Sequence, residues 1–144
     1  MEAAYRLAEE AGARGEVPIG ALVVRDGLVV GSGSNTKEAS TDPTAHAELL
    51  AIRAACHSIG NWRLSGAILI TTLEPCPMCL AAAQQARIKA LYYGATDLKG
   101  GALSLNYTLH SDSRLNHQFE VHSFPYEPAR KILTDFFRAR RNEQ

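Results

Sequence analysis

The sequence predicts an α/β domain built on one mixed β-sheet with helices on both faces. Two observations lead to this fold class. Two strand-like segments, 67–72 and 89–94, are joined through a helical segment, which is typical of parallel pairing. An earlier pair of apolar runs is joined by a tight turn, which is typical of an antiparallel hairpin. At 144 residues, the chain has the length of one ordinary domain, so we expect a single domain over residues 1–144.

The beginning of the chain is expected to supply one helix and the hairpin. Residues 3–13 predict a helix because their apolar side chains share one face. These side chains are Ala4, Leu7, Ala8 and Ala11. Residues 19–24 and 28–31 predict the two hairpin strands, since the Asp26-Gly27 pair between them tolerates a positive φ.

The next segment connects the hairpin to a second helix. Gly31-Ser32-Gly33-Ser34 lacks the Lys-Ser/Thr of a phosphate-binding P-loop, and we expect it to form a turn that carries Asn35. Asp42-Pro43-Thr44 supplies capping chemistry and a rigid start for a helix that runs to about residue 58. His46 is therefore expected in the first turn of that helix.

The second half of the chain continues the alternation of strands and helices. Residues 77–86 predict the helix that joins the two parallel strands. Residues 100–125 are loop-rich with short elements, and residues 128–141 predict a closing helix with apolar positions along it.

Composition excludes several classes of protein. Fifteen basic and fifteen acidic side chains cancel, so no global field attracts the chain to nucleic acid. Residues 1–86 carry six Lys/Arg and nine Asp/Glu, whereas residues 87–144 carry nine and six, so positive charge collects late in the chain. The apolar runs are too short to span a bilayer, no leader pattern opens the chain, and a Cys-x-x-Cys pair favours metal over a disulfide. We therefore expect a cytoplasmic protein.

Three residues have the types and spacing of zinc ligands. His46 and the pair Cys76 and Cys79 each lie where a helix is expected to begin, and ligands of open α/β sheets gather beyond the strands that feed such helices. Structural zinc normally has four protein ligands, whereas catalytic zinc keeps one position for water or substrate. Three ligands therefore predict a catalytic zinc ion. The alternative is a structural site completed by a fourth ligand such as His57.

Glu48 follows His46 by two positions and separates the catalytic interpretation from the structural one. A carboxylate beside the metal could take a proton from water and deliver it to a leaving group. Residues i and i+2 point apart on a regular helix, so this role requires the helix to start close to His46. Glu74, just before the cysteine pair, is as suited to orienting the loop as to touching substrate.

His46-Ala47-Glu48 followed by Pro75-Cys76-Pro77-Met78-Cys79 matches the H-x-E…P-C-x-x-C signature of zinc nucleobase deaminases. Further segments along nearly the whole chain resemble bacterial tRNA-specific adenosine deaminases. They are Gly15-Glu16-Val17-Pro18-Ile19-Gly20-Ala21, Asn35, Asp42-Pro43-Thr44, Gly94-Ala95-Thr96-Asp97, Asn116-His117 and residues 135–141. This resemblance implies a three-layer α/β/α, cytidine-deaminase-like fold with one five-stranded mixed sheet. It also implies a homodimer with one zinc ion per subunit, and conversion of adenosine to inosine at the first anticodon position of a tRNA.

The resemblance also implies roles for individual residues. Zinc would be bound by His46, Cys76 and Cys79, with Glu48 as the proton shuttle, and Asn35 would hydrogen-bond the flipped adenine. Residues expected to contact the tRNA anticodon stem-loop are Asp97, Lys99, Asn116, Phe137 and Arg140. Aromatic side chains that stack on bases and cations that meet phosphates suit single-stranded RNA loops.

Three alternatives remain at this stage. The motifs around His46 and Cys76 also occur in guanine deaminases, which act on a free base. A non-catalytic RNA-binding module could retain zinc for stability. The cations of the last helix could form only a solvated face, and its phenylalanines could belong to the core.

Overall fold

The computed structural model describes all 144 residues and contains one five-stranded sheet, four α-helices and a short 3₁₀ helix. In chain order the elements are α1 (Glu2–Ala13), β1 (Gly20–Arg25), β2 (Leu28–Ser34), α2 (Ala47–Ile59), β3 (Ile68–Thr71), α3 (Pro77–Gln85), β4 (Ala90–Tyr93), η1 (Leu109–Ser111), β5 (Glu120–Ser123) and α4 (Glu127–Asn142).

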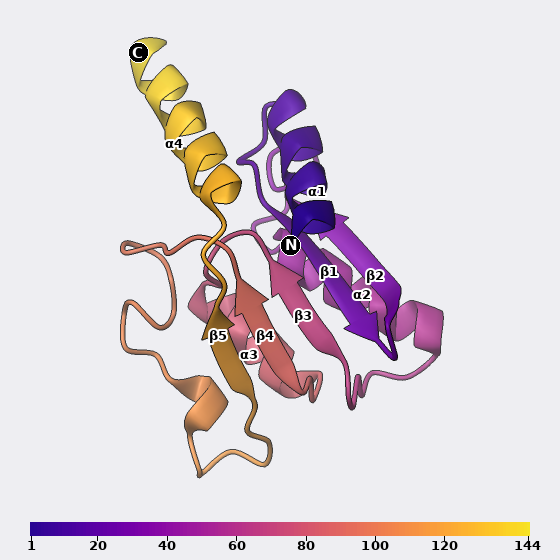
Figure 1. The fold of residues 1–144 in the computed structure, drawn as a ribbon. Coiled ribbons are helices and arrows are strands. Elements are labelled where there is room, and N and C mark those ends of the chain that lie inside the picture. The colour runs from indigo at the N-terminus through magenta and orange to yellow at the C-terminus, as the bar shows by residue number, and fades with distance from the viewer.

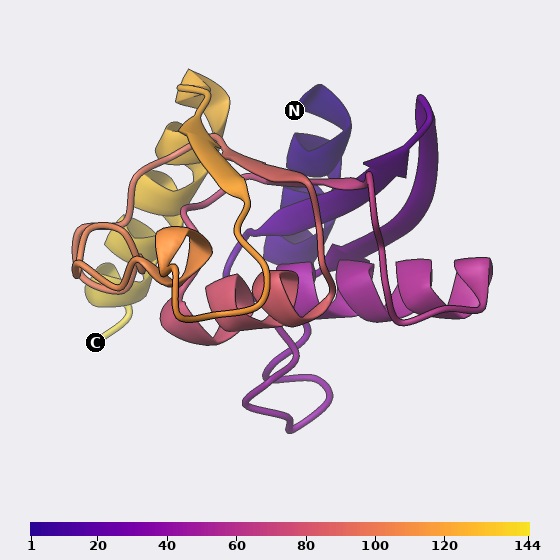
Figure 2. The same cartoon turned by 90° about the horizontal axis from the view of Figure 1, so that it is seen from below.

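The sheet has the strand order β2-β1-β3-β4-β5. Strand β1 pairs antiparallel with β2 and β3, whereas β3, β4 and β5 are parallel. Helices α2 and α3 cover one face of the sheet, and α1 lies on the other face with α4 beside it (Figures 1 and 2). The expected mixed sheet in a three-layer arrangement is confirmed. In Figure 1, α4 extends beyond the carboxyl ends of the parallel strands.

Small residues allow α2 to lie directly on the hairpin. A Cβ atom at Gly31 would lie 2.4 Å from the Ala51 carbonyl oxygen, and one at Gly33 would lie 2.6 Å from the Ala47 carbonyl oxygen. The helix face that meets these glycines is made of fully buried alanines, Ala47, Ala51 and Ala55. This close approach fixes the position of α2, whose first turn forms part of the metal centre described below.

Three details differ from the sequence-based expectations. Residues 31–34 do not form a turn, because β2 continues to Ser34. The fifth strand, β5, lies within the segment expected to be loop-rich. His46 does not lie in the first turn of α2 but is its N-cap, one residue before the helix begins.

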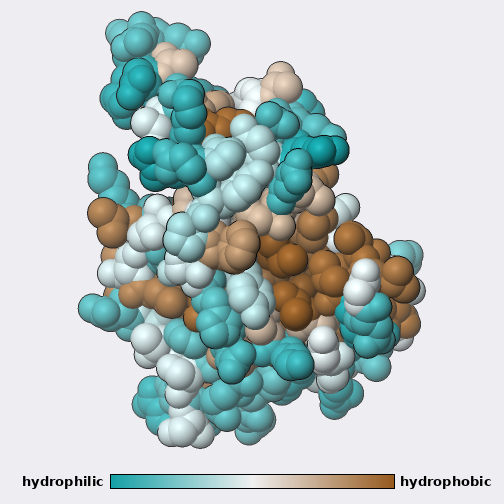
Figure 3. Space-filling view, in the orientation of Figure 1, coloured by the Kyte–Doolittle hydropathy of each residue, from teal (hydrophilic) through white to brown (hydrophobic).

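One part of the sheet is left uncovered. Figure 3 shows apolar side chains gathered on the front of the molecule below α1. Met1, Ile70, Tyr92 and Phe124 line an apolar hollow of about 200 Å³. None of the helices is both long enough and apolar enough to cross a membrane.

Candidate metal centre and active site

The metal centre is built where two helices begin. His46 is the N-cap of α2, with the extended backbone angles φ −77° and ψ 149°, and Cys76 is the N-cap of α3, with φ −70° and ψ 168°. Pro77 occupies the start of α3, where its missing N–H removes no helix hydrogen bond. Cys79 then falls in the first turn of α3. The positive ends of both helices face the site and favour negatively charged ligands.

The three side chains converge. The Nδ1 atom of His46 lies 3.5 Å from the Sγ atom of Cys76 and 3.5 Å from the Sγ atom of Cys79. All three potential ligand atoms lie within 4.8 Å of one another, which is close enough to hold one metal ion. His57 is exposed near the end of α2 and is not part of this group. The structural alternative, with His57 as a fourth ligand, is therefore wrong.

Hydrogen bonding sets the charge state of the cluster. The thiol of Cys79 lowers the pKa of Cys76 to about 4 by hydrogen-bonding to its thiolate, and His46 acts in the same direction. The hydrogen bond between the two cysteines, together with burial, raises the pKa of Cys79. The Cys76 thiolate raises the pKa of His46. Binding a cation through both sulfur atoms therefore requires the loss of the Cys79 proton.

Glu48 lies beside the metal ligands without being one of them. Its side chain is 3% exposed, and burial raises its pKa. Its Oε2 atom lies 3.4 Å from the Cys79 Sγ atom, and its Oε1 atom lies 3.0 Å from the Thr71 hydroxyl at the end of β3. Because His46 precedes the helix, His46 and Glu48 can approach the same point although they are two positions apart. The condition that the helix start close to His46 is met.

Two residues that support this site have no role in the sequence analysis. Thr71 is fully buried and orients the Glu48 carboxylate from 23 positions away. Glu16, also buried, accepts hydrogen bonds from the Glu38 amide at 3.1 Å and the Ala39 amide at 2.7 Å, and so holds the loop that leads to His46. Only the folded structure reveals these partners.

Asn35 is placed at the start of that same loop. It is 5% exposed, its Nδ2 atom donates to the Val17 carbonyl at 3.3 Å, and its Oδ1 atom accepts from the Lys37 amide at 3.2 Å. One N–H and one oxygen lone pair remain for another partner. A hydrogen bond to a substrate base stays a prediction.

A second loop is shaped by Glu74. Its buried carboxylate accepts hydrogen bonds from the Asp97 amide at 3.3 Å, the Ser104 amide at 3.0 Å and the Ser104 hydroxyl at 2.8 Å. Asp97 is turned into its own loop, where Oδ1 accepts from the amides of Lys99 at 3.1 Å and Gly100 at 3.0 Å. Glu74 therefore orients the loop, and the side chain of Lys99 is left exposed.

The remaining expected RNA contacts lie in two places. Phe137 is 45% exposed on α4, where its ring packs edge-on against Phe136. Arg140 donates to the Gly15 carbonyl at 2.8 Å and so ties α4 to the loop after α1. Asn116 is exposed before β5, at the amino end of the parallel strands, whereas Cys76 follows the carboxyl end of β3. The structure does not bring Asn116 to the metal centre.

Comparison with known proteins identifies the family of the chain. Residues 1–141 match the family model of MafB19-like deaminases. The tRNA-specific adenosine deaminase of Agrobacterium fabrum is 47% identical over 142 residues, which cover 98% of this chain and 93% of that protein. The tRNA-specific adenosine deaminase of Bacillus subtilis is 41% identical over 145 residues, which cover 100% of this chain and 90% of that protein.

Solved structures share the fold. One from studies of A-to-I editing by tRNA:A34 deaminases superposes with a TM-score of 0.83 at 45% identity, covering 92% of this chain and 97% of that one. The guanine deaminase from Bacillus subtilis superposes with a TM-score of 0.66 at 34% identity, covering 98% and 90%. The chain belongs to the MafB19-like deaminase family.

Proposed function

We propose that this protein is a zinc-dependent deaminase that converts adenosine to inosine at the wobble position of tRNA. The observation that carries the proposal is a buried glutamate, Glu48, held against a cluster of three metal-binding side chains. The names of the relatives at 41–47% identity support tRNA as the substrate. We further propose that the 144 residues act as one domain, in a cytoplasmic homodimer with one zinc ion per subunit.

The donor atoms fit zinc. Zinc–sulfur and zinc–nitrogen bonds of usual length at a tetrahedral angle separate a nitrogen and a sulfur ligand by about 3.6 Å, and the two nitrogen–sulfur separations here are 3.5 Å. A mixed imidazole and thiolate set is also a preferred set for this ion. When bound with one open position, zinc supplies activated water near neutral pH.

Residues of the chain itself then carry out the proton transfers. Burial raises the pKa of Glu48, so its carboxylate accepts a proton more readily than an exposed carboxylate does. Glu48 would take one proton from the attacking water and pass it to the adenine ring nitrogen. It would then take the second proton from the hydroxyl formed on the ring carbon and pass it to the amine, which leaves as ammonia. The reaction consumes adenosine and water and yields inosine and ammonia. Thr71 keeps the carboxylate in place during these transfers.

Two alternatives have distinct signatures. A guanine deaminase of this fold would act on a free base, but the guanine deaminase of Bacillus subtilis is less similar to the chain than the adenosine deaminases are. A non-catalytic RNA-binding module would have no need of a buried carboxylate beside the ligands, because isolated buried carboxylates are costly.

The deciding experiment incubates zinc-loaded protein with a tRNA that carries a wobble adenosine and measures inosine by sequencing. Inosine should form with the wild-type protein, and the Glu48→Gln variant should lose about 10² to 10⁴ in rate while it keeps its zinc. Conversion of free guanine to xanthine without inosine would select the guanine deaminase instead. Tight tRNA binding without turnover in either protein would select the binding module.

A further inference from the structure

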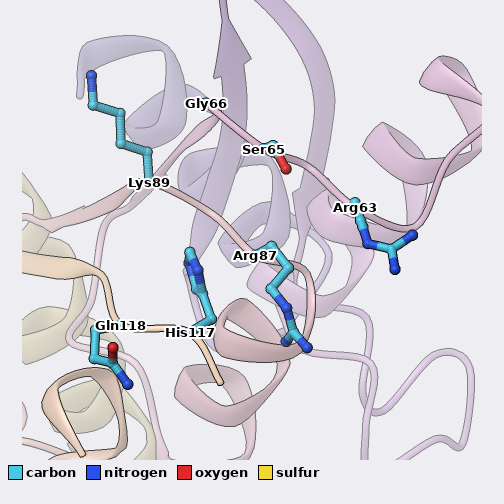
Figure 4. A pocket seen from close by; sticks show the side chains of 7 residues that line it. All are labelled: Arg63, Ser65, Gly66, Arg87, Lys89, His117 and Gln118. Atoms are coloured by element: carbon cyan, nitrogen blue, oxygen red, sulfur yellow. The ribbon is translucent and has the colours of Figure 1, made fainter. Parts of the chain in front are cut away.

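A polar hollow of about 490 Å³ opens at the amino ends of β3, β4 and β5 (Figure 4). Three connecting segments line it, and none of its seven residues is hydrophobic. We call it the basic hollow, because its lining side chains include Arg63, Arg87 and Lys89 but no carboxylate; Ser65, His117 and Gln118 complete the polar lining.

The three cations of the basic hollow have no acidic partner. None of the six salt bridges in the molecule includes Arg63, Arg87 or Lys89. The Arg87 guanidinium donates to the carbonyls of Gln84 at 3.0 Å and Gln85 at 3.3 Å through one nitrogen, which caps α3 and leaves other donors free. Positive charge at this edge of the sheet is therefore available to a ligand.

The arrangement of the cations favours an extended anion. In Figure 4 the side chains of Arg63, Arg87 and Lys89 fan out instead of converging on one point. A compact anion is bound by groups that converge on it, whereas a chain of phosphates meets cations that are spread along its path.

Trp62 adds a stacking surface beside these charges. Trp62 is the only tryptophan of the chain and is 53% exposed. The guanidinium carbons of Arg63 and Arg87 lie 4.1 Å and 5.8 Å from the indole centroid. An exposed aromatic ring next to cations is the combination that binds single-stranded nucleic acid, because the ring stacks on a base while the cations meet the backbone.

The basic hollow is separate from the metal centre. His46 caps the beginning of α2 and Trp62 follows its end, and a helix of 13 residues is about 20 Å long. The parallel strands lead to the same conclusion, because the hollow lies at their amino ends and Cys76 follows the carboxyl end of β3.

We infer that Trp62 and the basic hollow form a second RNA-binding site, which takes a single-stranded phosphodiester segment outside the catalytic centre. The inference extends the proposed function, since it rests on RNA being the substrate of the enzyme. Asn116, which the structure keeps away from the metal centre, directly precedes the lining residue His117 in the chain.

The test uses a short oligouridylate, which contains no adenosine and cannot be deaminated. It should quench the emission of Trp62, the only tryptophan, and the binding should weaken as salt is raised. With a fluorescein-labelled oligouridylate followed by anisotropy, Arg63→Ala and Lys89→Ala should each bind more weakly. Each should also reduce the slope of log affinity against log salt by about 0.7. Trp62→Ala should weaken binding about five-fold or more.

The matched control is Arg6→Ala, which removes one positive charge from α1 and should leave affinity and slope unchanged. The inference is overturned if the oligouridylate leaves the Trp62 emission unchanged. It is also overturned if Arg6→Ala loses as much affinity as Arg63→Ala and Lys89→Ala do. Equal quenching by tripolyphosphate also overturns it, in favour of a compact anion site. Because binding is measured without deamination, a protein that fails to make inosine but passes this test keeps the second site and loses only the proposed activity.

Discussion

Three glutamate side chains are almost fully buried in this molecule, and their partners separate their roles. Glu16 and Glu74 each accept hydrogen bonds from backbone amides, and each shapes one loop next to the metal centre. Glu48 instead lies between the Cys79 thiol and the Thr71 hydroxyl. Glu16 and Glu74 are each held by several amide donors, whereas Glu48 is oriented by one hydroxyl and lies beside a metal ligand, where a carboxylate can transfer protons.

Thr71 should matter for activity more than for stability. The Thr71→Val variant keeps the shape of the side chain but removes the hydroxyl that lies 3.0 Å from the Glu48 carboxylate. We expect about 10-fold slower inosine formation, by analogy with the loss of groups that orient metal ligands, and unchanged zinc content. Thr72→Val, which removes the neighbouring hydroxyl that accepts from the Gly20 amide, is the control. An equal loss of rate in the control would mean that damage to the sheet, and not Glu48 orientation, causes the effect.

His110 should make the protein less stable in mild acid. Burial lowers the pKa of its imidazole, and its Nδ1 atom is buried without a partner. The unfolded chain therefore binds a proton at a higher pH than the folded protein does, so stability is lost as pH falls below about 6.5. The free energy of unfolding can be measured in urea at about pH 7.5 and at about pH 5.5. Between these two pH values, His110→Leu should lose less of it than the wild type does. An identical loss in both proteins would contradict this role.

The residues that the sequence could predict are those that belong to a recognisable motif. His46, Cys76 and Cys79 were predicted as ligands because their types and spacing are typical of a metal site, and the structure brings them together. The roles of Thr71 and Glu16 could not be predicted, since no motif links either residue to its hydrogen-bond partner 22 or 23 positions away. The position of Asn116 depends on which end of the sheet its loop occupies, which the residue types do not indicate.

At the scale of elements, the start of α2 and its contact with β2 position the catalytic glutamate. Gly31 and Gly33 of β2 face the α2 backbone, and a side chain at either position would collide with it. The helix that carries Glu48 is therefore held at a distance set by glycine.

Gly33→Ala should displace α2. The added Cβ atom would lie 2.6 Å from the Ala47 carbonyl oxygen and 2.9 Å from the Ala51 nitrogen, which are backbone atoms that cannot rotate away. We expect a loss of about 1–3 kcal/mol in the free energy of unfolding, as for other overpacked sites, together with slower turnover. Ser32→Ala, at an exposed position of the same strand, should change stability by less than about 0.5 kcal/mol. Equal stability of the two variants in urea would contradict the close packing.

The same glycines explain why β2 was predicted to end too early. Alternating glycine and serine is typical of a turn, but here glycine serves helix packing inside a strand. Strand β5 was not located because it lies at the sheet edge, and Val121 is the only apolar residue among its four. Periodicity predicts elements that bury an apolar face, so α1, β1, β3, β4 and α4 were predicted within a few residues of their bounds.

At the scale of the whole molecule, the metal centre and the basic hollow lie at opposite ends of the parallel strands. The metal centre lies beyond the carboxyl end of β3, and the basic hollow lies at the amino ends of the parallel strands. The formal net charge of zero hides this arrangement. The sequence shows that positive charge collects late in the chain, and Arg87 and Lys89 come from that part. The third cation of the basic hollow, Arg63, comes from the earlier, net negative part. Only folding brings them to one edge.

The metal centre should also stabilise the whole fold, because its ligands join the beginnings of α2 and α3 across 30 positions of the chain. A ligand that binds only the folded state at 100 times its dissociation constant adds about 2.7 kcal/mol. Stripping the protein with a chelator should therefore lower its melting temperature, and added zinc should restore it. The gain in stability should shrink as pH falls, because zinc must displace the proton of Cys79, whose pKa is raised by the hydrogen bond with Cys76 and by burial. In Cys76→Ser, checked for folding by circular dichroism, zinc should give a much smaller shift. A chelator effect of equal size in this variant would show that the stabilising ion binds elsewhere.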